Sequence, residues 1–305
     1  MKTRKLLFGL LGIGFLASSC YTEVILEDEI IVESAFNTDQ ALQAYDLWYV
    51  DINATQGNGS IPFLQRAFTM SFVDGVVFAN NNIAGIGKTG NGLGIDVGSY
   101  GTFSGVVDID HDIDGAWTFD VFAVNNNTLR LYNRRTNTSY FLDGYQIRNF
   151  DYDRLFYENI EFLLQEFEAW EKTFTSEVGA VNEFDEENYL RFFSDNGGYF
   201  QSSIDAVGTP ISRLQWDYEG DYAIFDTNDE TLKTLTLDYD YLGNDYFELY
   251  VIDDSTVELY HVASETVYEF TGRGFVQYLK APSNNGRERT KTSRKKMSVD
   301  RKRKM

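Results

Sequence analysis

Short runs in which apolar and polar residues alternate follow one another along most of the chain. This period of two is typical of a β-strand with one buried and one wet face. It predicts strands at 46–52, 66–73, 75–80 and 103–110, with turns at Asp74-Gly75 and Asp114-Gly115. The runs FDVFAVNN and TLRLYNR, split by Asn125 to Asn127, predict a hairpin, and DYFELYVI and TVELYHV predict another around 253–255.

Helical periodicity is confined to two segments. Thr38 to Leu47 could form one short helix. Tyr152 to Thr173 is predicted as a longer helix whose apolar stripe is Leu155, Ile160, Leu163, Leu164, Phe167 and Trp170.

Two parts of the chain repeat each other. Residues 110–144 align with 238–272 at a constant offset of 128, and ten of these 35 positions are identical. LQAYDLW at 42–48 also matches LQEFEAW at 164–170, at an offset of 122. Internal repetition of this size indicates duplication of one small domain. The sequence therefore predicts a mainly β fold of two tandem small antiparallel meander barrels, each preceded by a helix, at 37–148 and 149–278.

The first twenty residues have the pattern of a targeting segment. Lys2, Arg4 and Lys5 precede an apolar run that is short for a membrane span, and small residues then lead to Cys20. This arrangement resembles the bacterial lipoprotein signal, in which the cysteine is acylated and becomes the first mature residue. The resemblance implies a signal peptide at 1–19, lipidation of Cys20, an acidic linker at 20–36 and membrane anchoring in the cell envelope. The alternative is an ordinary secretory peptide with a chance cysteine.

Charge is strongly segregated along the chain. Ten of the 26 basic residues lie in 281–305 and three in the signal, which leaves 13 basic against 45 acidic residues in 20–280, a net charge of −32. Such a body repels phosphate backbones and argues against nucleic-acid binding. The basic tail at 279–305 is predicted to be disordered. It either partly offsets the acidic body or contacts anionic envelope polymers or lipid headgroups.

The early tryptophan, the F-x-D-G-x-V strand–turn–strand and the hairpin before Gly144 and Gly272 resemble the lipocalin-like domains of Bacteroidetes lipoproteins. The segments LWYVDIN, GTFSGVVDIDHDIDG and LTLDYDYLGNDYFELY also resemble a flavobacterial lipoprotein family. Members of that family often carry the name nicotinic acid mononucleotide adenylyltransferase. The resemblance implies an outer-membrane lipoprotein, and the name implies nucleotidyl transfer.

The residues themselves do not support that transfer. Such transferases use a histidine pair, H-x-G-H, to stabilise charge on the phosphates, whereas His111 and His261 are 150 residues apart. AGIGKTGNGLG at 84–94 mimics a phosphate loop, but Asn82 occupies the position of its first glycine and the glycines after Lys88 disfavour the required helix. This segment is therefore predicted to be a loop between strands.

DIDHDIDG at 108–115 is the stretch that looks most like a chemical site. Asp110, Asp112 and Asp114 have the spacing of calcium ligands, but the closing glutamate of an EF-hand loop is replaced by Val121. The second copy retains Asp238 and Asp240 and the alternation around them. A barrel strand with one buried and one wet face is the main interpretation, and a weak calcium site in the first copy is the alternative.

No catalytic residues are assigned from the sequence, and no cofactor other than calcium is expected. The hypothesis is a non-enzymatic, lipid-anchored binding or scaffold module whose barrel mouths or aromatic faces contact a small hydrophobic ligand, a glycan or an envelope protein. Two linked weak sites would gain avidity. The alternatives are an enzyme, either the adenylyltransferase or a carboxylate-based glycan hydrolase, and an assembly factor.

Overall fold

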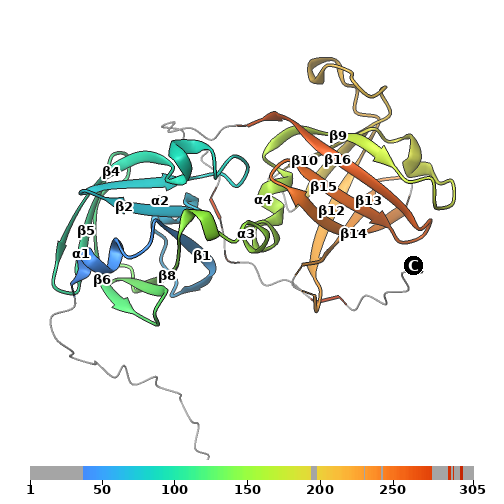
Figure 1. Ribbon diagram of the computed structural model, residues 1–305. Helices are drawn as coiled ribbons and strands as arrows, with labels where there is room; N and C mark the ends of the chain where they lie inside the picture. The colour runs from blue at the N-terminus through green and yellow to red at the C-terminus, as the bar shows by residue number, and fades with distance from the viewer. Residues whose placement is uncertain are drawn as a thin grey trace, which may run out of the picture. The chain divides into compact units, whose positions relative to one another are not determined.

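The computed structural model describes residues 37–193, 198–229, 231–241, 243–276, 288–289, 291 and 296–297 (Figure 1). The predicted signal peptide, Cys20, the acidic linker and most of the basic tail lie outside the described residues. The described part of the chain forms two closed barrels of eight antiparallel strands each. The predicted fold class is therefore confirmed.

The first barrel follows the helix α1 (Thr38–Leu42). Its strands are β1 (Leu47–Gln56), β2 (Thr69–Val73), β3 (Val76–Asn80), β4 (Ile95–Phe103), β5 (Val106–His111), β6 (Gly115–Ala123), β7 (Thr128–Asn133) and β8 (Thr138–Tyr145). The connections before β2 and β4 contain α2 (Pro62–Arg66) and the 3-10 helix η1 (Thr89–Gly92). Pairing of β8 with β1 closes the barrel.

The second barrel follows η2 (Ile147–Asn149), α3 (Tyr152–Glu158) and α4 (Ile160–Leu164). Its strands are β9 (Phe167–Thr175), β10 (Tyr189–Phe193), β11 (Tyr199–Ser203), β12 (Tyr218–Asp226), β13 (Lys233–Tyr239), β14 (Gly243–Asp253), β15 (Thr256–His261) and β16 (Thr266–Phe275). The connections before β10 and β12 contain η3 (Glu183–Glu186) and η4 (Ile211–Arg213). Pairing of β16 with β9 closes this barrel.

The helix predicted over residues 152–173 is wrong in its second half. Helical structure ends at Leu164, and Phe167 to Thr175 form β9. Strand β9 pairs with both β10 and β16, so it is needed to close the barrel. This tertiary pairing outweighs the local helical periodicity of Phe167 and Trp170. The helix predicted from Thr38 is likewise shorter than expected and ends at Leu42.

The duplication seen in the sequence is repeated in the backbone. Asn133 pairs with Thr138 in the first barrel, and His261 pairs with Thr266 at the equivalent position in the second. The turn between these strands uses a left-handed residue in both copies, Asn137 with φ 50° and Glu265 with φ 58°. The two hairpins therefore have the same register and the same turn geometry.

The start of each barrel is also built in the same way. The indole N–H of Trp48 donates to the Leu42 carbonyl at 2.7 Å, and that of Trp170 donates to the Leu164 carbonyl at 2.7 Å. Both indoles are almost completely buried. Each tryptophan thus ties the end of the entry helix to the first strand and satisfies a helix-terminal carbonyl.

Large side chains fill the barrel interiors near one end. In the first barrel, Phe63 of α2 lies 6.3 Å from Phe119, measured between ring centroids. In the second, Phe184 of η3 lies 4.7 Å from Phe247. All four rings are buried. The connection between the first two strands therefore inserts a phenyl ring into the core of each barrel.

Five residues of the basic tail are described, and they depart from the predicted disorder: besides Arg289, Lys291 donates to the Thr55 carbonyl at 3.1 Å and the Met297 backbone N–H to the Asp226 carbonyl at 2.8 Å. Arg289 is fully buried; its backbone N–H donates to the Gln65 carbonyl at 2.7 Å, and its guanidinium to the Val50 carbonyl at 3.0 Å. The guanidinium carbon also lies 4.3 Å from the centre of the Phe68 ring. Burial lowers the pKa of Arg289 to about 10. This part of the tail packs against the folded body.

Candidate ligand-binding groove

The DIDHDIDG segment forms the end of β5 and the turn into β6. Ile109 and His111 are buried, whereas Asp110 between them is exposed. Gly115 has φ 74°, a left-handed conformation that favours glycine at this turn. The strand interpretation is confirmed for Asp108 to His111, which belong to β5, whereas Asp112 to Asp114 form the turn and Ile113 is exposed instead of continuing the buried face.

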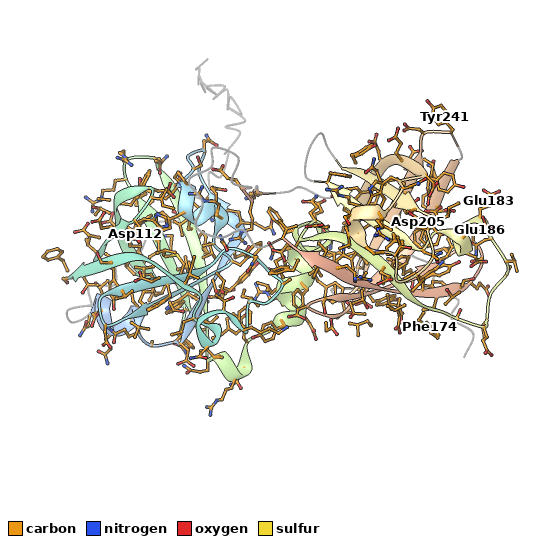
Figure 2. All side chains as sticks on the ribbon, turned by 90° about the horizontal axis from the view of Figure 1, so that it is seen from above. Asp112, Phe174, Glu183, Glu186, Asp205 and Tyr241 are labelled. Carbon is orange, nitrogen blue, oxygen red and sulfur yellow. The ribbon has the colours of Figure 1, made fainter. Side chains whose placement is uncertain are left out.

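The three aspartates of the alternative calcium site are not arranged as a set of ligands. Asp114 accepts a hydrogen bond from the Arg66 guanidinium at 2.5 Å, which already neutralises its carboxylate. Figure 2 labels Asp112, whose backbone N–H donates to the Val97 carbonyl at 2.9 Å. Among the described residues, no group of three or more acidic, histidine or cysteine side chains could hold a metal ion. The structure therefore does not bring Asp110, Asp112 and Asp114 together as a calcium site.

Two adjoining hollows on the first barrel share Trp117 in their lining, and we call them the Trp117 groove. Trp117 pairs with the buried Ile109 and packs against the core, whereas its neighbours Ala116 and Thr118 lie on the outer face. A hollow of about 530 Å³ is lined by residues of β4, β5 and β6, and one of about 400 Å³ by the start of β5, by β6, and by the end of β7 with the turn after it. The lining includes Tyr100, Asp108, Asp110, Trp117 and Thr118 in the first hollow. It includes Trp117, Asp120, Asn133, Arg134 and Arg135 in the second.

Polar contacts hold the side chains of the groove in place. The Trp117 indole N–H donates to the Asp114 carbonyl at 3.0 Å, and the Arg135 guanidinium carbon lies 4.1 Å from the Trp117 ring centre. Arg134 donates two hydrogen bonds to Asp120, at 2.5 and 2.9 Å. Two parallel bonds of this kind fix geometry as well as charge. The groove is thus an ordered surface and not a set of unrestrained side chains.

The chemistry of the groove favours a ligand that has both an apolar face and many hydroxyl groups. Guanidinium groups donate, carboxylates accept, and the Thr118 hydroxyl does both. The Trp117 indole is partly accessible; because its N–H is bonded to the Asp114 carbonyl and Arg135 lies over its ring, it adds only the apolar surface that remains exposed. A sugar ring offers C–H faces and hydroxyls that donate and accept, so it matches this combination.

The glycine-rich segment has a different role from the phosphate loop that it resembles. The backbone N–H groups of Ile83 and Ala84 donate to the two carboxylate oxygens of Glu166, at 2.7 and 2.6 Å. Lys88 pairs with Asp254 at 3.1 Å. Backbone amides of this kind form an anion site, and here the anion is a carboxylate of the chain itself. The segment is a loop between β3 and β4, as predicted, and it contacts Glu166 just before β9 and Asp254 in the turn between β14 and β15.

The two histidines lie in separate barrels. His111 stacks on Phe63 with 5.0 Å between centroids, and its Nδ1 accepts the backbone N–H of Asp114 at 3.1 Å. His261 lies beside Ser264, with 2.7 Å between Nδ1 and Oγ, and beside Asp245, with 3.2 Å between Nε2 and Oδ1. The described structure therefore does not form the histidine pair that an adenylyltransferase uses.

His261, Ser264 and Asp245 are the three residue types of a hydrolase triad, but Ser264 belongs to the turn between β15 and β16, and Asp245 lies on the neighbouring strand β14. Ser264 is buried and also hydrogen-bonded to Thr266, at 2.8 Å. At the offset of 128, Asn133 is equivalent to His261 and Thr136 is equivalent to Ser264. These two residues of the first copy are also in contact, because the Asn133 side chain accepts the backbone N–H of Thr136 at 2.9 Å. This arrangement stabilises the turn before β16.

Sequence reasoning missed one buried acid in the second barrel. Glu187, directly after η3, is almost inaccessible, and the Tyr239 hydroxyl lies 2.9 Å from both of its carboxylate oxygens. Burial raises the pKa of Glu187 to about 7, although the hydrogen bond from Tyr239 opposes that rise. Glu187 lies in the acidic run EFDEEN at 183–188, and nothing in that run distinguishes it from the exposed Glu186 beside it.

Comparison with known proteins adds no assignment. No family model matches the chain, and the search of curated proteins found no match. Within the described residues, no helix combines the length and the apolar character needed to span a membrane.

Proposed function

We propose that the protein is a lipid-anchored component of a bacterial cell envelope whose two barrels form a non-enzymatic binding module. Cys20 is the proposed attachment point, and an outer-membrane location follows from the resemblance to Bacteroidetes lipoproteins. The basic tail is proposed to contact anionic envelope polymers. The observation that carries the binding role is the Trp117 groove, in which an indole is bordered by paired arginine and aspartate side chains.

A glycan is the ligand that we propose for the Trp117 groove. A small hydrophobic ligand in the barrel interior fits less well, because aromatic rings fill the interior near one end of each barrel. The enzyme alternative has less support than the binding role. The amides that resembled a phosphate loop hold Glu166, and the histidines serve separate local contacts.

Lipid attachment is tested by labelling cells with a palmitate analogue. Cys20→Ala should abolish incorporation into this protein, since Cys20 is the only cysteine of the chain. Ser19→Ala, one residue earlier, serves as the control and should still be labelled. Continued labelling of the Cys20→Ala protein would contradict the anchor.

Glycan binding is tested with the full chain in mild detergent, by electrophoresis through gels that contain neutral polysaccharides. We expect retarded migration of the wild type and about tenfold weaker apparent affinity for Trp117→Ala, a loss of about 1.4 kcal/mol. Trp117→Phe retains an aromatic face and should keep most of the binding. Unretarded wild-type protein in gels of glucan, mannan and xylan would refute the proposed function.

A further inference from the structure

The outer face of β10, β11 and β12 in the second barrel carries aromatic and polar side chains. Arg191 pairs with Gln201, Phe193 with Tyr199, and Gln201 with Glu219, so all five residues lie on the same face. Leu190, Phe192 and Phe200, which alternate with them, are buried in the core. The five residues are therefore on the side of the sheet that faces away from the core.

Trp216, from the connection before β12, completes this surface. The Arg191 guanidinium carbon lies 4.5 Å from the centre of the Phe193 ring and 5.9 Å from that of Trp216. Phe193 and Tyr199 have their ring centroids 5.3 Å apart. We call this set, Arg191, Phe193, Tyr199, Gln201, Trp216 and Glu219, the Trp216 platform.

The segment that carries Trp216 is held on both sides of the tryptophan. The Asp205 carboxylate, labelled in Figure 2, accepts the backbone N–H of Gln215 at 2.7 Å. The Asp217 carboxylate accepts the backbone N–H of Ile204 at 3.0 Å. Since the residues before and after Trp216 are both tied to the end of β11, the indole is positioned before any ligand binds. Such preorganisation lowers the entropic cost of binding.

The equivalent face of the first barrel is covered. Thr69 and Ser71 of β2 lie on its outer face and are fully buried. Thr69 accepts a hydrogen bond from Asn80 at 2.8 Å, and Asn80 also donates to the Gly92 carbonyl at 3.3 Å. The connection that contains η1 thus covers β2. In the second copy, the side chains of Arg191, Phe193 and Trp216 stay partly accessible.

From this difference between the copies we infer that the Trp216 platform is a second binding surface, for neutral oligosaccharides. This inference rests on the proposed function, because it adds a second contact for the same class of ligand. The rings of Trp216, Phe193 and Tyr199 offer flat faces to sugar C–H groups. Gln201 supplies a donor and an acceptor, Arg191 donors and Glu219 acceptors.

The charge of the platform selects neutral over anionic glycans. Arg191 is accompanied by Glu219, whose carboxylate accepts the Tyr199 hydroxyl, and by Asp221 on the same face opposite Tyr199. The surrounding body is also strongly acidic. A polyanion would therefore be repelled, whereas a neutral hexose polymer is not.

If one chain has two binding surfaces, long ligands should bind more tightly than short ones. A polymer that reaches both the Trp117 groove and the Trp216 platform binds with avidity, whereas a short oligosaccharide occupies each surface separately. Loss of either tryptophan should then weaken binding of a polysaccharide more than binding of a hexasaccharide.

The test compares Trp216→Ala, Trp117→Ala and the double variant of the full chain in mild detergent. Affinity electrophoresis uses gels of β-glucan, mannan or xylan, with polygalacturonate as the anionic comparator. Phe174→Ala is the control, because Phe174 is an exposed aromatic residue of the second barrel outside the platform. We expect about tenfold weaker retardation by the neutral polymer for each single variant, further loss for the double variant and no change for the control.

The outcomes separate this inference from the proposed function. If Trp117→Ala weakens retardation and Trp216→Ala behaves as the wild type, the platform is refuted and the groove stands. If Trp216→Ala alone weakens retardation, the platform stands and the groove is refuted. Lack of retardation of the wild type by every neutral polymer refutes both, and retardation by polygalacturonate alone refutes the assignment to neutral glycans.

Discussion

Glu187 shows how one residue can make the stability of the second barrel depend on pH. Its carboxyl is buried, and its pKa is raised from an ordinary value of 4.5 to about 7. The folded protein therefore holds a proton on Glu187 at pH values where the unfolded chain has released it. The stabilisation by this proton is complete below pH 4.5 and is lost as the pH rises through about 7.

We predict that Glu187→Gln removes this pH dependence. The neutral amide avoids burial of a charge, so the variant should be more stable than the wild type at pH 8.5, by about 2–3 kcal/mol. At pH 5 the two proteins should differ much less. Urea unfolding at both pH values measures the difference.

Glu186→Gln is the matched control for this prediction, since Glu186 is the exposed neighbour of Glu187 and is labelled in Figure 2. Its unfolding curve should follow that of the wild type at both pH values. If Glu187→Gln and the wild type lose stability in parallel between pH 5 and 8.5, the raised pKa of Glu187 is wrong.

At the scale of single elements, the sequence located several strands of the first barrel and the hairpins of both copies, but it did not locate β4 or β10 to β12 and made both helices too long. Alternation is a local signal, and it located β2, β3 and the hairpins of both copies. The segment from Phe167 to Thr175 has helical spacing but becomes β9, because its partners β10 and β16 come later in the chain. The offset of 122 already aligned Trp170 with Trp48 in a predicted strand, so the repeat was the better guide there.

We predict that alanine at Gly144 or Gly272 destabilises its own barrel. A Cβ atom at Gly144 would meet the Tyr45 ring, and one at Gly272 would meet the Phe167 ring, in both cases at 2.5 Å or closer. Such overlap forces a ring to move and costs about 1–3 kcal/mol. Thermal unfolding of the two single variants measures this cost.

Removal of the opposing ring provides the control. In a Tyr45→Ala background, Gly144→Ala should cost much less than in the wild type, and a double-mutant cycle gives the difference. Gly101→Ala should be tolerated, because a Cβ atom there has open space. Equal costs of Gly144→Ala with and without Tyr45 would contradict the contact.

At the scale of the whole molecule, the candidate binding surfaces could be predicted only in outline. Aromatic content and duplication suggested aromatic faces, but Trp117 and Arg135 are 18 residues apart and meet only because β6 and β7 are neighbours. Arg191 and Trp216 meet through the connection before β12 in the same way. Local patterns such as DIDHDIDG and the glycine-rich segment resemble ligand sites, yet the first forms the end of β5 and a turn, and the second forms a contact to Glu166.

The contact between Glu166 and the glycine-rich segment is one of the contacts that join the two barrels, beside a shared cluster of buried apolar residues. Glu166 is almost completely buried and accepts two backbone N–H groups from the first barrel, whereas the Lys88–Asp254 pair is largely exposed. Charge-assisted hydrogen bonds in a buried site are much stronger than exposed ion pairs. Coupling of the barrels should therefore depend on Glu166 and little on Lys88.

We predict that the wild type unfolds in a single calorimetric transition and that Glu166→Ala separates this transition into two. The variant leaves the N–H groups of Ile83 and Ala84 without their acceptor, at a cost of about 2–4 kcal/mol. Lys88→Met removes the exposed pair and should shift the transition temperature by no more than about 2 °C. If Glu166→Ala still unfolds in one transition at the wild-type temperature, this carboxylate does not couple the barrels. The avidity proposed for the Trp117 groove and the Trp216 platform would then depend on other contacts to hold the two surfaces together.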